Sequence, residues 1–277
     1  MPISFFKDLS NPHHLQTNRI EVPDDLKHVV EGFYVFGDDH CDGKQLFFND
    51  GYPVIAFMPE KGEKTRLTVN GDLKLVENAW VCGGMLKNVY CESSVAFKDV
   101  FVIRFHPITF FGSFELGTNY FDTTQVSNFS EFAGDDFAEF NDAFYQTNST
   151  MDRVLLTSVF LAKRTRSNRY PELLITILNS IEKSDYLSVK SLLKEYTARI
   201  NYKWIERNFK RHVGMSPKNY ISIRRFLKAY LDLQSSGSKD LLEVALNHGY
   251  YDDNHFIKDF RKFSGVPPKT YFQNIRK

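Results

Sequence analysis

The C-terminal third of the chain contains an internal repeat in which equivalent residues lie 51 positions apart. The matched positions carry helix-capping, apolar, basic, glycine, proline and tyrosine residues, and agreement at so many positions indicates a duplicated structural unit. The matched pairs are Asn201 and Asp252, Ile205 and Phe256, Arg207 and Lys258, Phe209 and Phe260, Lys210 and Arg261, Gly214 and Gly265, Pro217 and Pro268, Lys218 and Lys269, and Tyr220 and Tyr271.

Local residue preferences predict that each copy is a helix-turn-helix unit. Asn201 and Asp252 are residue types that cap helix N-termini, and each is followed by apolar residues four apart, which share one helix face. Gly214 and Gly265 end these two expected helices. Before the second copy, residues 242–251 predict a short helix and a tight turn, which complete the motif. The expected units span about residues 187–213 and 240–263.

The segment between the two copies predicts one long linking helix. Residues 218–234 carry apolar residues at helical spacing and are followed by a Ser- and Gly-rich stretch. Two recognition helices on one face of DNA enter major grooves about 34 Å apart. A rigid helix of four to five turns is suited to holding two small units at such a distance.

The chain has a net charge of only +1 because a basic C-terminal part and an acidic N-terminal part nearly cancel. Residues 171–277 contain 19 Lys and Arg against 11 Asp and Glu, a balance of +8, whereas residues 1–170 have a balance of −7. Of the 26 Phe, 20 lie before residue 171. Opposite charge and different composition predict two domains with different partners, and the basic one is a candidate for binding nucleic acid.

With this motif pattern, the C-terminal third resembles the AraC/XylS family of bacterial transcription regulators. The resemblance rests on Glu243, Val244, Ala245, Gly249, Tyr250, Asp252, Phe256, Lys258, Phe260, Arg261, Lys262, Gly265, Pro268 and Tyr271 in the second unit, on Ile205, Arg207, Phe209, Lys210, Gly214, Ser216, Pro217 and Tyr220 in the first, and on Arg225 and Ala229 between them. It implies an all-α DNA-binding domain over residues 172–277. The turn before Asn201 is about two residues longer than the family's and lacks its glycine, and Lys258 replaces the usual arginine.

The resemblance also implies which side chains contact DNA. The base-reading candidates are Lys203, Glu206, Arg207, Asp253, Asn254 and Lys258. The phosphate-binding candidates are Lys210, Lys218, Arg261 and Lys269. By side-chain chemistry, Arg207 suits guanine, Asn254 suits adenine and Glu206 suits cytosine, while contacts to phosphate fix the register without reading sequence.

The N-terminal part, residues 1–166, predicts a mostly-β domain followed by helices, so the whole chain belongs to the α+β class. Residues 53–58, 65–69, 79–81 and 99–105 are rich in β-branched and aromatic residues, as strands are, and Asn70-Gly71 is a hairpin signal. We expect a small barrel or sandwich, with residues 167–171 as the linker to the second domain. In outline this resembles the sensor domain of AraC-type regulators, which implies effector binding, dimerisation or both.

No motif in the sequence predicts catalysis, a metal site or a cofactor. The Cys and His residues lack the close pairing that zinc sites use, and there is no nucleophile elbow, phosphate-binding glycine loop or dinucleotide fingerprint. The sequence also has no signal peptide and no apolar run of the ~18 residues that a membrane span needs. Three scattered cysteines do not form a disulfide framework, so we expect a cytoplasmic protein. The lack of catalytic motifs and of a membrane span leads us to expect that it is not an enzyme and has no membrane partner.

Together these patterns predict a sequence-specific DNA-binding transcription regulator. Its expected partners are double-stranded DNA, a small-molecule effector, a second copy of the chain and, for an activator, RNA polymerase. One alternative is an interaction or oligomerisation protein with degenerate helix-turn-helix units, to which the unusual first turn points. A second is a DNA repair methyltransferase with an AraC-like segment, but the surroundings of Cys41, Cys82 and Cys91 do not resemble the nucleophile motif that such an enzyme needs.

Overall fold

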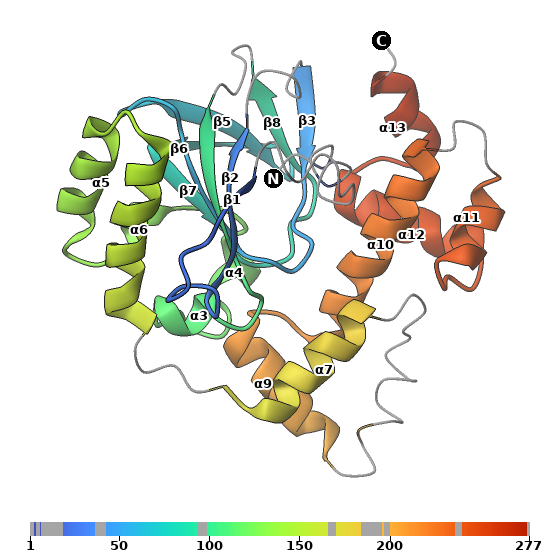
Figure 1. Cartoon of the computed structure of the whole chain (residues 1–277). Coiled ribbons are helices and arrows are strands. Elements are labelled where there is room, and N and C mark those ends of the chain that lie inside the picture. Colours follow the sequence, from blue (N-terminus) through green and yellow to red (C-terminus); the bar gives the residue numbers. More distant parts are fainter. Residues whose placement is uncertain are drawn as a thin grey trace.

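The computed structural model describes residues 3, 6, 19–36, 43–93, 99–165, 170–183, 196, 200–235 and 240–275. Most of the first helix of the first expected helix-turn-helix unit, most of the expected linker, and Cys41 lie outside these residues. Figure 1 shows two sheets with helices beside them, followed by helices alone. Below, the N-terminal β-rich part means the described residues up to 165, and the C-terminal helical part means those from 170 to 275.

Two antiparallel sheets form the N-terminal β-rich part, in agreement with the predicted fold class. The six-stranded sheet has the order β1-β2-β9-β4-β7-β10, and the four-stranded sheet has the order β3-β8-β5-β6. The first consists of β1 (Arg19–Ile20), β2 (Val30–Phe36), β9 (Val100–Phe105), β4 (Val54–Phe57), β7 (Ala79–Cys82) and β10 (Ser127–Asn128). The second consists of β3 (Gly43–Phe47), β8 (Val89–Ser93), β5 (Lys64–Val69) and β6 (Asp72–Glu77).

Strands β5 and β6 form the hairpin that the sequence predicts. Asn70 and Gly71 have φ angles of 54° and 100°, as a two-residue hairpin turn requires, and Val69 pairs with Asp72 across the turn. The other predicted strands are also present, as β4, β7 and β9.

Two apolar cores lie on the two faces of the six-stranded sheet. The first lies between the sheets, where the rings of Phe47 and Trp80 are 5.2 Å apart. The second contains Phe57, whose ring centroid is 4.3 Å from that of Phe144. Helices cover this second core: α3 (Phe110–Ser113), α4 (Tyr120–Thr123), the 3₁₀ helix η2 (Phe129–Glu131), α5 (Phe137–Gln146) and α6 (Thr150–Thr165). Many of the abundant phenylalanines are therefore packing residues of these cores.

Helices alone make up the C-terminal helical part. They are α7 (Glu172–Lys183), α9 (Tyr202–His212), α10 (Pro217–Ser235), α11 (Leu241–Asn247), α12 (Asp253–Ser264) and α13 (Pro268–Ile275). The repeat is visible as two pairs of helices, α9 with the start of α10 and α12 with α13. The predicted linking helix is α10. Among the described residues, no helix combines the length and the apolar character needed to cross a membrane.

The core between the sheets continues into the C-terminal helical part. The ring of Phe48 lies 5.3 Å from that of Phe226 on α10 and 5.4 Å from that of Phe263 on α12. All three side chains are buried. Close packing of apolar side chains therefore fixes these helices relative to the sheets.

Candidate nucleic-acid interface

Helix α12 presents one apolar face to the core and one polar face to solvent. Asp252 caps the helix, since its Oδ1 accepts a hydrogen bond of 2.7 Å from the backbone N–H of His255. Phe256, Phe260 and Phe263 are buried at the spacing of one helix face. The opposite side exposes Asn254, His255, Lys258 and Arg261, and Asp253 is half-buried beside them.

Helix α9 repeats this arrangement in the first unit. Asn201 caps it by accepting a 2.9 Å hydrogen bond from the N–H of Lys203. Ile205 and Phe209 are buried, whereas Lys203, Arg207 and Arg211 are exposed. Glu206 and Lys210 are half-buried and form an ion pair of 3.4 Å. A pair at this exposure contributes only about 0.3–0.5 kcal/mol, so both side chains remain available to other partners.

Two further lysines lie in the first turns of the helices that follow α9 and α12. Lys218 is exposed at the start of α10, and Lys269 is exposed at the equivalent place on α13. The N-terminal end of a helix carries a partial positive charge, which adds to that of the lysine. This combination suits a phosphate oxygen. The structure therefore exposes seven of the ten candidate contact residues and half-buries three. The exposed ones are Lys203, Arg207, Lys218, Asn254, Lys258, Arg261 and Lys269, and the half-buried ones are Glu206, Lys210 and Asp253.

Contacts between helices fix the second unit on α10. Arg225 forms an ion pair of 3.0 Å with Asp259 of α12, and its guanidinium lies 4.0 Å from the ring centroid of Tyr250. His248, after α11, lies 3.0 Å from the carboxylate of Asp232. Burial raises the pKa of Tyr250 well above its ordinary value, so this phenol stays neutral within the packed unit.

One exposed aromatic residue at the interface was not predicted from the sequence. Tyr251 is 88% exposed, directly before the cap residue Asp252. A tyrosine at this exposure has an apolar ring and a hydroxyl free to meet a sugar or phosphate of DNA. Its position could have identified it, because Tyr251 lies between the turn at Gly249 and the cap residue Asp252. Its neighbour Tyr250, in contrast, is buried, as expected for a packing residue.

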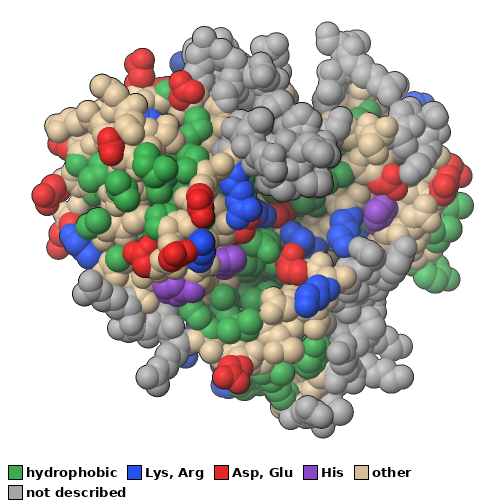
Figure 2. Space-filling model, in the orientation of Figure 1, with side chains coloured by type: hydrophobic (Ala, Val, Ile, Leu, Met, Phe, Trp, Pro, Cys, Tyr) green, Lys and Arg blue, Asp and Glu red, His purple; other side chains and the backbone are tan. Residues whose placement is uncertain are grey.

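A second candidate site is a pocket between the two parts of the chain. Figure 2 shows charged and histidine side chains gathered along the hollow between them, with apolar side chains beneath. The pocket has a volume of about 320 Å³. It is lined by Phe6, Arg19, Glu31, Tyr34, Asp50, Tyr52 and Arg104 from the N-terminal β-rich part and by Arg224, Leu227, Lys228 and Leu231 from α10.

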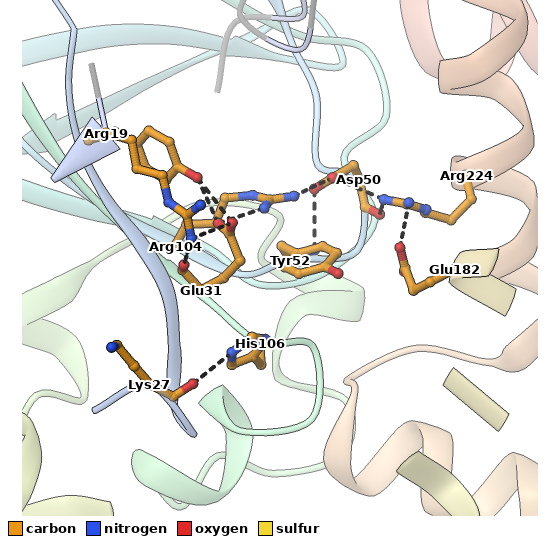
Figure 3. Close-up of polar contacts among 10 residues, drawn as sticks. Arg19, Lys27, Glu31, Asp50, Tyr52, Arg104, His106, Glu182 and Arg224 are labelled. Carbon is orange, nitrogen blue, oxygen red and sulfur yellow. Dashed lines mark hydrogen bonds and ion pairs between the residues drawn. The ribbon is translucent and has the colours of Figure 1, made fainter. Parts of the chain in front are cut away.

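A network of ion pairs crosses this pocket (Figure 3). Arg104 donates to Glu31 at 2.8 Å and to Asp50 at 2.5 Å. Asp50 also accepts from Arg224 at 3.1 Å, and Arg224 donates to Glu182 at 2.5 Å. Burial opposes the charge of Arg104, but the carboxylates of Asp50 and Glu31 hold its pKa above the ordinary value. Charges of both signs therefore alternate from one part of the chain to the other.

A larger pocket of about 640 Å³ adjoins the first and shares Arg19 and Glu31 with it. Its other lining residues are the apolar Ile20, Val22 and Val30, the charged Glu21 and Lys27, and His106. Nε2 of His106 lies 3.0 Å from the carbonyl oxygen of Lys27. Burial lowers the pKa of His106, which favours the neutral ring at pH 7. No cluster of metal-ligating side chains occurs within the described ranges.

Comparison with known proteins relates the C-terminal helices to transcription regulators. Residues 197–274 match a helix-turn-helix domain family. The chain is 36% identical over 66 residues to the HTH-type transcriptional activator RhaS of Pectobacterium carotovorum subsp. carotovorum (strain PC1), covering 24% of this chain and 23% of that protein. It is 30% identical over 71 residues to the XylDLEGF operon transcriptional activator of Pseudomonas putida, covering 25% and 22%. The match thus spans about a quarter of these relatives.

Two further comparisons extend beyond this segment. The Tn10 TetD protein of Escherichia coli is 32% identical over 85 residues, which is 30% of this chain and 61% of TetD. The crystal structure of ToxT from Vibrio cholerae O395 aligns over 92% of this chain and 94% of ToxT, with 14% identity and a TM-score of 0.41. A TM-score below 0.5 does not establish a common fold, so the fold description above rests only on the structure of this chain.

Proposed function

We propose that this chain, whose residues 197–274 are a helix-turn-helix domain of the AraC/XylS type, is a sequence-specific DNA-binding transcription regulator. The observation that carries the proposal is the duplication of α9 and α12. Each helix is capped at the same repeat position, buries the same apolar face and exposes a basic residue at the equivalent positions Arg207 and Lys258. Two similar reading helices on one chain suit two successive major grooves.

Each exposed side chain has a role that its chemistry suits. Arg207 pairs with guanine through two parallel hydrogen bonds, and Asn254 pairs with adenine in the same way. Glu206 accepts from the amino group of cytosine, and Lys203, Asp253 and Lys258 lie beside these readers on the same helix faces. The phosphate-binding residues in this proposal are Lys210, Lys218, Arg261 and Lys269.

A small-molecule effector, in this proposal, binds in the pocket between the two parts of the chain. Side chains from both parts line this pocket, so an occupant contacts the β-rich part and the linking helix α10 together. The space between the sheets, by comparison, is filled by buried apolar side chains. If effector and DNA binding are coupled, each changes the affinity for the other by the same factor.

The domain boundaries and the partners complete the proposal. In this proposal, residues 1–166 form a domain for effector binding, dimerisation or both, 167–171 form the linker and 172–277 form the DNA-binding domain. A homodimer is supported by the exposed stripe of Met151, Leu155 and Val159 on α6, where 54%, 54% and 63% of each residue's surface is accessible. An activator of this kind also contacts RNA polymerase.

Selection of binding sites from random DNA tests the proposed function. The full chain is incubated with duplexes of random sequence, and bound duplexes are recovered over several rounds and sequenced. We expect two conserved half-sites separated by about one helical turn, 10–10.5 base pairs from centre to centre. Recovery of duplexes with no shared sequence would contradict sequence-specific reading.

A further inference from the structure

The two helix-turn-helix units are held by the N-terminal β-rich part at equivalent points. Gly214 and Gly265 lie 51 residues apart, directly after α9 and at the end of α12. Both have positive φ, 73° and 77°, because each ends its helix in the left-handed conformation. Each of these turns packs against a different element of the N-terminal β-rich part.

The first contact is between Phe111 of α3 and the turn after α9. A Cβ atom at residue 214 would overlap the Phe111 ring, so the ring occupies the space that a side chain would fill. Phe111 is 2% exposed and is itself held by Phe110 and Phe121, whose rings lie 5.9 and 5.8 Å away. The turn after α9 therefore packs against a cluster of buried rings, Phe110, Phe111 and Phe121.

The second contact is between the start of β8 and the turn after α12. The backbone N–H of Asn88 donates to the carbonyl oxygen of Phe263 at 2.7 Å. The hydroxyl of Tyr90 donates to the carbonyl oxygen of Ser264 at 2.5 Å. The amide of Asn88 also fills the space beside Gly265, where a Cβ atom would overlap it.

Packed residues of the N-terminal β-rich part connect the two contacts. Phe121, which packs on Phe111, also fills the space beside Gly83 and Gly84, in the connection that leads from β7 to β8. Asn88 lies at the end of this connection, and its carbonyl accepts from the N–H of Asn70 in the β5–β6 hairpin at 3.0 Å. In Figure 1, α3 lies beside α9. A movement of one turn relative to the other must therefore break packed contacts.

We propose that the N-terminal β-rich part is a clamp that fixes the distance and angle between α9 and α12, and that Phe111, Asn88 and Tyr90 thereby determine which spacing of DNA half-sites the protein accepts. The statement about DNA rests on the proposed function, whereas the clamp itself does not. One added base pair moves the second half-site by about 3.4 Å and rotates it by about a tenth of a turn. If α9 and α12 are held rigidly, they cannot shift and rotate to reach both half-sites at the new spacing. If only α10 joined them, their relative position could adjust more easily.

A distance measurement without DNA tests the clamp directly. Spin labels are attached to cysteines in place of Arg207 and Lys258, which are exposed and equivalent in the repeat. Cys41 is replaced by serine, while Cys82 and Cys91 are buried and remain. Pulsed electron paramagnetic resonance on the full chain then gives the distribution of distances between the labels. We expect one narrow peak.

Substitutions in the clamp are compared with matched substitutions elsewhere. Asn88→Gly with Tyr90→Phe removes the side-chain contacts to the second turn, and Phe111→Leu loosens the first. The matched controls are Asn78→Gly with Tyr145→Phe, and Phe140→Leu. Asn78 also has a positive φ and a side-chain hydrogen bond, and Tyr145 also donates to a backbone carbonyl, but both contacts stay within the N-terminal β-rich part. Phe140 is likewise a buried ring of that part, packed on Phe160. The clamp variants should broaden the peak and the controls should not. A broad peak in the parent chain, or equal widths in clamp and control variants, would overturn the proposal. If a larger substitution prevents folding, Tyr90→Phe alone is used as the clamp variant, because it removes only the hydroxyl that donates to Ser264.

A series of half-site spacings then tests the consequence for DNA. The selected duplex is lengthened or shortened between its half-sites by one base pair at a time, and affinity is measured for each variant. We expect the parent chain to lose about tenfold or more in affinity per base pair, and the clamp variants to lose about threefold or less. An unchanged loss in the clamp variants overturns the role in spacing. If no duplex is selected, the proposed DNA-binding function fails, and the distance measurement still decides on the clamp.

Discussion

Arg224 of the linking helix donates a hydrogen bond of 3.1 Å to Oδ2 of Asp50, a residue 174 positions earlier in the chain. The same carboxylate accepts from Arg104 of β9. Asp50 is 3% exposed and is thus the buried anion that joins the six-stranded sheet to α10, the helix between the two helix-turn-helix units. This relationship links the N-terminal β-rich part, the pocket and the linking helix α10.

Replacement of Asp50 by alanine should destabilise the whole chain. It leaves two guanidinium groups without their shared carboxylate, and breaking a buried ion pair by removing one partner costs about 3–5 kcal/mol. Because Arg224 is one-fifth exposed, we expect the lower end of this range. Urea unfolding followed by circular dichroism measures the change. Asp142→Ala is the control, because its ion pair with Lys61 is half exposed and contributes about 0.5 kcal/mol or less. Similar losses in both variants would contradict the role of Asp50.

Arg207→Ala and Lys258→Ala should each weaken binding to the selected duplex. If these side chains read bases, each change costs about 1–3 kcal/mol and relaxes specificity at one position of the site. Fluorescence anisotropy with the selected duplex and with single-base variants of it measures both effects. Lys61→Ala, an exposed lysine in the loop before β5, is the control for loss of charge. Unchanged affinity in both recognition-helix variants would remove these residues from the interface.

Lys269→Ala should weaken binding by a similar factor for every sequence. A phosphate contact releases counterions without reading bases, so its loss lowers the slope of log affinity against log salt by about 1. Titrations at several salt concentrations, with the selected and a scrambled duplex, give this slope. A loss confined to the selected duplex would assign Lys269 to base reading instead.

The free energy of unfolding should fall as the pH drops below about 6.5, in part because of His106. Burial lowers the pKa of this imidazole from its ordinary value of 6.5 in the folded chain. Below that pH the unfolded chain therefore binds more protons than the folded chain, and protonation favours unfolding. His106→Gln should flatten this part of the pH dependence. Exposed His28→Gln is the control, and an equal flattening by both would refute the assignment.

Local sequence signals were sufficient to predict helices α9, α10, α11 and α12, but α7 was not predicted. The cap residues, the apolar spacing and the glycine and proline positions each act within a few residues, and α9, α10 and α12 begin and end within one residue of the predicted bounds. The Asn70-Gly71 hairpin was predicted for the same reason. In these elements local preference and the final fold agree.

Long-range contacts could not be predicted in this way. Strand β9 lies between β2 and β4, although the three are distant in the sequence, because pairing depends on the whole sheet. In the sequence, Asp50 stands beside a glycine and Arg224 is one of several basic residues on an amphipathic helix, so nothing local shows that the two form an ion pair. Gly214 and Gly265 were identified as helix ends, but nothing local reveals that Phe111 and Asn88 fill the space beside them.

The most direct test of the account is fluorescence anisotropy of the full chain with the duplex from upstream of its own gene, beside a scrambled duplex of equal composition, at several salt concentrations. If the chain reads sequence, we expect a preference of about 10³-fold or more for the upstream duplex, as sequence-specific regulators show. Equal binding to both duplexes, with a steep loss as salt rises, would mean attraction to phosphate alone and would contradict sequence-specific reading. Absence of binding even at low salt would favour an interaction protein with degenerate helix-turn-helix units.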